Sequence, residues 1–270
     1  MSEGQQKTTI LKLGGSVLTE KDKPFTPNLS NLNRLAREIA GGFDPQHRRL
    51  VLVHGAGSFG HPITKRTGIH RGLLSPEDLV SFATVQRWQN QWNVIVVEAL
   101  QNQQVPAIPI QPSSHAVMEK GRIVSFSLDV IEGVLELGML PVLYGVPAYD
   151  RALGSTILSG DQIVSYLGEK LKADKVILGT NVDGLFTGDP KEEPDAELIE
   201  MVTRKDLVEV RRYLVKPSGA DVTGGMSGKF REIVRLAERG ITCLIINAGT
   251  AGTVEAALTG EKVKGTLIRL

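Results

Sequence analysis

The sequence is short of the features that mark several large classes of protein. It has one cysteine in 270 residues, which rules out a disulfide within the chain. Its 31 basic residues nearly balance 30 acidic ones, which leaves no broad field to attract nucleic acid or an anionic membrane. No apolar run reaches the ~20 residues that span a bilayer, and the start, "MSEGQQKTT", lacks the apolar segment of a signal peptide. We therefore expect a cytoplasmic globular protein that binds neither nucleic acid nor membranes.

The residues that are present predict an α/β fold. Hydrophobic residues make up 41% of the chain, enough to fill a sizeable core. Short β-branched runs recur at "TTILKLGG", "RRLVLVHG", "VPAIPIQP", "LPVLYGV", "DKVILGT" and "ITCLIINA". Helical spacing of apolar residues occurs in "NLSNLNRLAREIAGGF", "SPEDLVSFATVQRWQNQWNVIVVEALQNQ", "LDVIEGVLELG", "GDQIVSYLGEKLKA" and "MSGKFREIVRLAERG". This alternation predicts a mainly parallel sheet with helices on both faces, and Cys243 as a buried side chain in one strand.

The first glycine-rich turn follows the first predicted strand and reads "LKLGGSVLTEKDK". Lys12 lies in the strand, and Gly14, Gly15 and Ser16 follow at its carboxyl end, where open α/β sheets bind ligands. Small residues let backbone N–H groups approach an anion, and a lysine in an apolar strand needs an anionic partner. The alternative is an ordinary tight turn beside a lysine that extends into solvent.

The second turn, "HGAGSFGH", carries Gly55, Gly57 and Gly60 in the spacing of a dinucleotide-binding loop. Such a loop needs an acidic residue about 20 positions on, at the end of the next strand. The chain has Glu77 and Asp78 there, at the predicted start of a helix, where they complement the helix dipole instead. The pattern therefore favours a turn for one phosphate.

Two residues of this second turn are candidate donors to that phosphate, namely Ser58 and His61. A histidine before a proline is otherwise an ordinary surface residue. Further turns add Asp161 in "SGDQIV" and Lys229 in "DVTGGMSGK", where glycines and a lysine open a helix that can receive an anion. Asp161 can also be read as a simple helix starter. No Walker A loop is present, because Phe230 follows the glycine-lysine pair.

The order and spacing of "LKLGGS", "HGAGSFGH", "SGDQIV", "TNVDGLFTGDP" and "DVTGGMSGK" resemble the amino acid kinase superfamily over nearly the whole chain. Within it, "GSFGH" together with "DVTGGMSGK" is most similar to the isopentenyl phosphate kinases, and fosfomycin resistance kinases share the histidine-bearing turn. The resemblance implies an open three-layer αβα sandwich that forms a homodimer. It also implies one domain with an acceptor-binding lobe at about residues 1–160 and an ATP-binding lobe at about residues 161–270.

The same resemblance assigns roles to residues that match its motifs. Catalytic roles fall to Lys12, Lys21, His61, Asp161 and Lys229. The acceptor phosphate would be bound by Gly55, Ala56, Gly57, Ser58, His61 and Gly160. The ATP site would comprise Lys12, Gly14, Gly15, Ser16, Thr180, Asp183, Gly184, Phe186, Lys216, Gly225 and Lys229. Ala56 replaces a glycine found in many relatives, and it fits if its φ is negative.

The implied reaction is ATP-dependent phosphorylation of isopentenyl phosphate to isopentenyl diphosphate, in isoprenoid precursor synthesis. The acceptor is already ionised near neutral pH, so Asp161 would organise the lysines rather than act as a base. Mg²⁺ would accompany ATP, bound by phosphates and water rather than by a dedicated protein site. Phe82, Val85 and Ile157 are candidates for an apolar slot that binds the hydrocarbon tail.

Other readings stay open. A fosfomycin-type phosphonate kinase would keep the phosphate turn and dispense with the apolar slot. A kinase for UMP or for an acyl carboxylate is a further rival, although a carboxylate would not call for His61. A nucleotide-sensing regulator without turnover would use the same fold. The stretch "GVPAYDRALGSTILSGD" matches relatives loosely, and we interpret it as an insertion-like loop that bears on the choice of acceptor.

Overall fold

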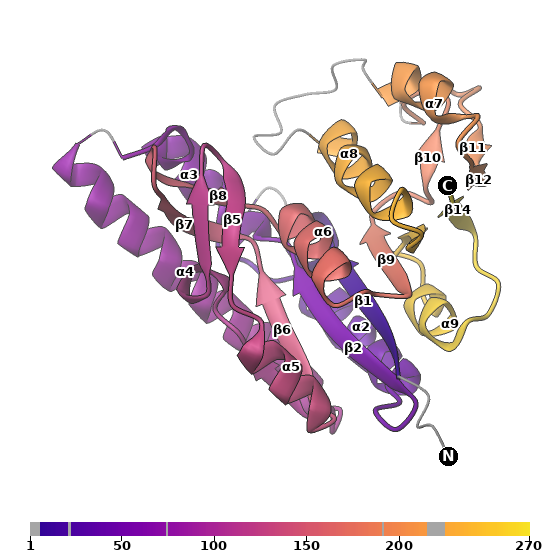
Figure 1. The fold of residues 1–270 in the computed structure, drawn as a ribbon, viewed down its shortest axis with the longest axis horizontal. Coiled ribbons are helices and arrows are strands. Elements are labelled where there is room, and N and C mark those ends of the chain that lie inside the picture. The colour runs from indigo at the N-terminus through magenta and orange to yellow at the C-terminus, as the bar shows by residue number, and fades with distance from the viewer. Residues whose placement is uncertain (1–5, 21–22, 74, 191, 215–224) are drawn as a thin grey trace.

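An eight-stranded sheet forms the centre of the protein in a computed structural model that describes residues 6–20, 23–73, 75–190, 192–214 and 225–270 (Figure 1). Its strands, in spatial order, are β12 (Met201–Val202), β14 (Gly265–Ile268), β13 (Thr242–Asn247), β9 (Lys175–Thr180), β1 (Lys7–Leu13), β2 (Arg48–His54), β6 (Leu140–Tyr144) and β3 (Ala107–Pro109). Neighbours from β13 to β3 are parallel, and β14 pairs antiparallel with β13. The predicted mainly parallel sheet is confirmed.

Helices cover both faces of this sheet, as predicted. One apolar layer contains α5 (Asp129–Glu136), α6 (Gly160–Lys170), α7 (Leu207–Leu214) and α8 (Gly225–Ala237). The opposite layer contains α1 (Gly15–Leu18), α2 (Leu29–Gly42), α4 (Pro76–Gln101) and α9 (Thr253–Thr259). Side chains alternate along β1, so that Ile10 packs in the first layer and Leu11 in the second. Lys12 therefore faces the layer of α6 and α8.

A second, four-stranded sheet lies beside the amino-terminal half of α4 (Figure 1). Its order is β5 (Arg122–Phe126), β4 (Ala116–Glu119), β7 (Val146–Asp150) and β8 (Gly154–Leu158). The remaining elements are α3 (His61–Thr67), the pair β10 (Leu185–Phe186) and β11 (Leu198–Ile199), and the 3-10 turns η1 (Gly57–Phe59), η2 (Ile69–Arg71) and η3 (Pro112–Ser114).

The stretch read as an insertion-like loop is instead the hairpin β7–β8, so that interpretation was wrong. Its turn is held by the buried Asp150 carboxylate, which accepts N–H bonds from Ala152 and Leu153 at 2.9 and 3.0 Å. The same carboxylate accepts N–H bonds from Lys120 and Gly121 in the β4–β5 turn, at 3.1 and 2.8 Å. One side chain therefore organises both hairpins of the second sheet.

Cys243 is buried in β13 as predicted, and burial raises the pKa of its thiol to about 12. A thiol with this pKa stays protonated at neutral pH and packs as a small apolar side chain. No described helix is long and apolar enough to cross a membrane.

Candidate functional site

The candidate site lies where β1, β2 and β9 end side by side. Leu13 at the end of β1 is in register with His54 of β2 and Gly179 of β9. Two backbone bonds join the turns that follow these strands. Gly14 N–H donates to the Gly179 carbonyl and Gly55 N–H to the Leu13 carbonyl, both at 2.9 Å. The glycine-rich turns predicted from the sequence are therefore neighbours at one edge of the sheet.

Two lysines meet one carboxylate at this edge. Lys12 Nζ lies 2.6 Å from Asp161 Oδ1, and Lys229 Nζ lies 3.4 Å from Asp161 Oδ2. Asp161 is in the first turn of α6, whose amino end is capped by Ser159 through a 3.2 Å bond from Gln162 N–H. Three elements distant in the sequence, β1, α6 and α8, thus bring two cations and one anion together.

Close helix packing places Lys229 at this position. A Cβ added to Gly168 of α6 would lie 2.7 Å from Leu236 Cδ2 of α8, so the two helices pack closely at this glycine. Gly160 packs against the Lys12 side chain, as shown by the 3.4 Å that would separate a Cβ at Gly160 from Lys12 Cε. The lysines are therefore held by packed backbone as well as by charge.

Burial and the lysines act in opposite directions on Asp161. Its burial disfavours the charged form, but Lys12 and Lys229 outweigh that effect and hold the pKa of the carboxyl below its ordinary value. Asp161 is consequently ionised at neutral pH. With two ammonium groups and one carboxylate, the cluster carries a net positive charge at the sheet edge, where it can stabilise phosphate oxygens.

The turns after β1 and β2 touch through their backbones. A Cβ on Gly15 would lie 2.4 Å from the Gly57 nitrogen, and one on Gly55 would lie 2.4 Å from the Gly15 nitrogen. Gly57 also has φ of +51°, a left-handed conformation that favours glycine. Ala56 has φ of −64°, the negative value under which its alanine was expected to fit.

The two candidate donors of the acceptor turn have different surroundings. Ser58 is buried, and its hydroxyl accepts the Thr26 N–H and donates to the Thr26 carbonyl, both at 3.2 Å. Its own N–H donates to Thr19 Oγ1 at 3.0 Å. In this conformation Ser58 therefore binds Thr19 and Thr26, and its role as a phosphate donor stays a prediction. His61 is exposed at the first residue of α3.

Beneath the acceptor turn lies a buried histidine that the sequence analysis did not single out. His54 has its Nε2 3.0 Å from Asn93 Oδ1 and its Nδ1 3.1 Å from the Gly55 carbonyl, which also accepts the Trp92 Nε1–H bond at 3.2 Å. Its ring stacks on Tyr144 at 5.5 Å. Burial lowers the pKa of His54 to about 4, so the ring is neutral at physiological pH and only one of these two nitrogens donates a hydrogen.

Residues assigned to the nucleotide follow the end of β9. Thr180 is buried and donates its hydroxyl to the Val182 carbonyl at 2.7 Å, which shapes the turn. Asp183 accepts the Asn247 Nδ2–H bond at 2.9 Å and pairs with Lys264 at 2.6 Å. The hydrogen bond from Lys264, joined by that from Asn247, lowers the pKa of the Asp183 carboxyl. Asn247 and Lys264 lie far from Asp183 in sequence and carry no motif that would have identified them.

Three more residues of the predicted nucleotide set have distinct positions. Gly184 follows Asp183, and a Cβ there would lie 2.4 Å from Thr266 Oγ1. Phe186 is half-buried in β10, and Gly225 begins α8. Lys21 and Lys216, also assigned from the sequence, lie outside the described residues.

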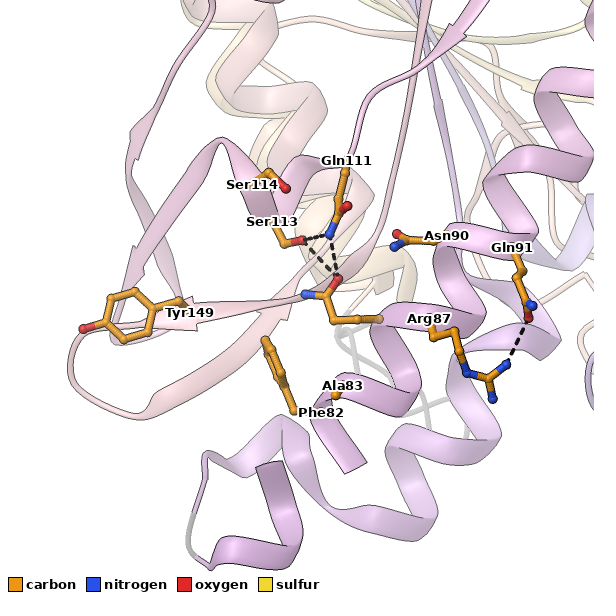
Figure 2. A pocket seen from close by; sticks show the side chains of 10 residues that line it. Phe82, Ala83, Arg87, Asn90, Gln91, Gln111, Ser113, Ser114 and Tyr149 are labelled. Carbon is orange, nitrogen blue, oxygen red and sulfur yellow. Dashed lines mark hydrogen bonds between the residues drawn. The ribbon is translucent and has the colours of Figure 1, made fainter. Parts of the chain in front are cut away.

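The residues predicted to line an apolar slot have separate surroundings in the described chain, and their role stays a prediction. Phe82 lines an open cavity of about 610 Å³ between α4, η3 and β7, in which Gln86, Gln111 and Ser113 form a hydrogen-bonded cluster (Figure 2). Val85 instead packs with Ile63 and Ile69 in a small buried cluster. Ile157 is half-buried on β8. Phe82, Ala83 and Tyr149 line the same cavity, so its wall combines apolar surface with these amide and hydroxyl groups.

Comparison with known proteins assigns the chain to a family. Residues 7–247 match the model of the amino acid kinase family, and the chain belongs to that family. It is 43% identical over 266 residues to an isopentenyl phosphate kinase of Methanothermobacter thermautotrophicus, covering 96% of this chain and 98% of the relative. A second isopentenyl phosphate kinase, from Methanocaldococcus jannaschii, is 36% identical, covering 96% of this chain and 98% of the relative.

Solved structures agree with that assignment. A crystal structure of an isopentenyl phosphate kinase superposes with a TM-score of 0.83 at 39% identity, covering 97% of this chain and 99% of that chain. The three-layer sandwich expected from the motifs is therefore the fold of the family.

Proposed function

We propose that this chain is a phosphotransferase that moves the γ-phosphoryl group of Mg-ATP onto the phosphate of a small acceptor. The acceptor we assign is isopentenyl phosphate, which gives isopentenyl diphosphate and places the enzyme in isoprenoid precursor synthesis. The observation that carries the proposal is the Lys12–Asp161–Lys229 cluster beside two touching glycine turns. The relatives over nearly the whole chain length support the choice of acceptor.

The proposed phosphoryl transfer needs positioned substrates and positive charge, and it does not need a general base. A phosphate acceptor carries its nucleophilic oxygen already ionised near neutral pH, since its second pKa is about 6. Asp161 is a poor base because its pKa is lowered and its two oxygens each meet a lysine. We assign Lys12 and Lys229 to the charge that develops on the transferred group, and Asp161 to holding them apart and in place.

The acceptor side combines a polar turn with an apolar neighbourhood. His61 begins α3, and Ile63 two residues later belongs to the buried cluster with Ile69 and Val85. These three side chains are buried and pack on one another, so the choice of a hydrocarbon tail over the polar body of fosfomycin is supported by the isopentenyl phosphate kinases among the relatives.

Mg²⁺ enters the proposal as part of the substrate Mg-ATP. Among the described residues no three His, Cys, Asp or Glu side chains gather as a metal site. We assign most of the ligands of the ion to the ATP phosphates and water, which Mg²⁺ commonly keeps. We also propose that the chain works as a homodimer in two lobes, as the motifs imply.

Phosphorus NMR tests the proposed reaction. Purified protein with Mg-ATP and isopentenyl phosphate should convert both, one for one, into ADP and a new diphosphate. His61→Asn should lower kcat/KM by ~10²-fold, the usual effect of one lost transition-state donor, with an unchanged melting temperature as the control for folding. ATP hydrolysis without a new diphosphate would contradict the proposal.

A further inference from the structure

The two glycine-rich turns contact each other so closely that their separation is fixed by the protein. The turn after β1 would carry ATP phosphates and the turn after β2 the acceptor phosphate, and a methyl group on Gly15 or Gly55 would overlap the opposite backbone. Phosphoryl transfer requires reacting atoms about 3–3.5 Å apart and in line, and a misplacement of about 1 Å can cost ~10²-fold in rate. The distance between these two turns therefore affects the rate of phosphoryl transfer.

One side chain bridges the two turns through a single hydroxyl. Thr19 Oγ1 donates to the Gly15 carbonyl at 2.8 Å and accepts the Ser58 N–H bond at 3.0 Å. A Cβ on Gly57 would lie 2.3 Å from the same oxygen, so the hydroxyl occupies the space that this glycine leaves. Thr19 itself is 4% exposed.

We propose that Thr19 is a positioning residue for phosphoryl transfer, whose hydroxyl sets the distance between the nucleotide turn and the acceptor turn. The inference rests on the proposed function, because it assumes that each turn holds one of the two reacting phosphates. Thr19 acts through Gly15 and Ser58, and its side chain is buried.

This role makes a distinctive kinetic prediction. A residue that binds one substrate changes the affinity for that substrate when it is replaced. A residue that only spaces two sites leaves each ligand's separate binding nearly intact and slows the step that needs both. Loss of the Thr19 hydroxyl should therefore appear in kcat.

Thr19→Val removes the hydroxyl at nearly constant shape, and Thr19→Ser keeps it. Thr9→Val is the matched control, since Thr9 is also buried and lies near the opposite end of β1. We expect Thr19→Val to lose ~10- to 100-fold in kcat, while Thr19→Ser and Thr9→Val stay within ~3-fold of the parent. The Kd of Mg-ADP and the KM of isopentenyl phosphate should change by less than ~3-fold in all of them.

Amide hydrogen exchange at Ser58 tests the bridge independently of activity. Its N–H bonds to Thr19 Oγ1, so exchange should accelerate in Thr19→Val and stay slow in Thr19→Ser. If Thr19→Val does not fold, Thr19→Ala compared with Thr19→Ser isolates the hydroxyl at equal loss of the methyl group.

The outcomes separate the inference from the proposed function. Parental kcat in folded Thr19→Val, or equal loss in the serine and alanine variants, overturns the positioning role. The positioning role is also overturned if the Ser58 amide exchanges at the same rate with and without the Thr19 hydroxyl. A parent protein that turns over no isopentenyl phosphate contradicts the proposed function alone, because the Ser58 exchange still decides whether Thr19 joins the turns.

Discussion

Replacing Asp161 by asparagine removes the one negative charge between two lysines. The carboxylate oxygens lie 2.6 Å from Lys12 Nζ and 3.4 Å from Lys229 Nζ, and the lysine side chains are 7% and 20% exposed. At an effective dielectric constant of about 20, an ion pair at such distances gains roughly 5 kcal/mol before desolvation. Breaking a buried pair by removing one partner costs about 3–5 kcal/mol, because a charge is left without its partner. We expect Asp161→Asn to lower the free energy of unfolding by about 3 kcal/mol, since Lys229 keeps some access to water.

The pH dependence of this loss follows from the direction of the pKa shift. The pKa of Asp161 is lower in the folded protein, so its stabilising contribution is present above the unfolded pKa of about 3.9. That contribution is lost as the pH falls through the folded value. The difference between parent and Asp161→Asn should therefore be full at pH 7.5 and should shrink below about pH 4.

Urea unfolding at pH 7.5, with and without a non-hydrolysable Mg-ATP analogue, measures the effect. The analogue's phosphates offer Lys12 and Lys229 new anionic partners, so bound nucleotide should restore part of the lost stability. We also expect kcat to fall by ~10²-fold or more, since the lysines lose their organising anion. Asp195→Asn, at an exposed carboxylate, is the control and should leave both quantities unchanged. Parental stability and parental kcat in Asp161→Asn would refute this reasoning.

Three further predictions follow from the packing around the site. Gly15→Ala places a methyl group 2.4 Å from a backbone nitrogen and should lower kcat/KM by ~10²-fold. A methyl group added at Gly133 in α5 would meet nothing within 4 Å, so Gly133→Ala should raise the free energy of unfolding by about 0.5–1 kcal/mol in urea. The ion pair of Arg122 with Glu232 at 2.6 Å joins the β4–β5 hairpin to α8. The double variant Arg122→Gln/Glu232→Gln should therefore lose less unfolding free energy, and less kcat, than the sum of the losses in the two single variants. The lowered pKa of His54 should make stability decline by about 3 kcal/mol as the pH falls from about 6.5 to about 4, and His54→Gln should flatten that decline in urea unfolding at pH 7.5 and 4.5.

Each of these predictions has an opposite outcome that the structure does not allow. Gly15→Ala with parental kcat/KM would mean that the two turns separate freely. Additive losses at Arg122 and Glu232 would mean that their contact does not couple the hairpin to α8. A decline with pH that persists in His54→Gln would mean that other groups carry it.

Local pattern was enough to predict the scaffold. The strands that became β1, β2 and β9 are short β-branched runs, and the turns that follow them are rich in glycine. Parallel strands put their carboxyl ends at one edge, so turns far apart in the sequence had to meet there. The hairpin β7–β8 was missed because its alternation is broken by Pro147 and Gly154, and because the turn depends on Asp150.

Contacts made only by tertiary packing could not be predicted. Thr19 lies in the stretch "LKLGGSVLTEKDK" that the motifs single out, but its bridge exists because the Gly15 and Ser58 backbones converge on it. Asn247 and Lys264 contact Asp183 although both lie more than 60 residues later in the sequence. The apolar slot was assigned from the long helix and the strand before Asp161; Phe82 lines a cavity beside α4, Val85 packs in a separate cluster, and the slot stays a prediction.

The choice of acceptor tests the central claim most directly. The measurement is kcat/KM with Mg-ATP for isopentenyl phosphate, fosfomycin and UMP under one set of conditions, by ADP release. Burying a five-carbon tail at about 0.8 kcal/mol per carbon predicts that isopentenyl phosphate exceeds the other two by at least ~10²-fold. A higher value for fosfomycin or UMP, or turnover of none of them by folded protein, would contradict an enzyme built to phosphorylate an isoprenoid monophosphate.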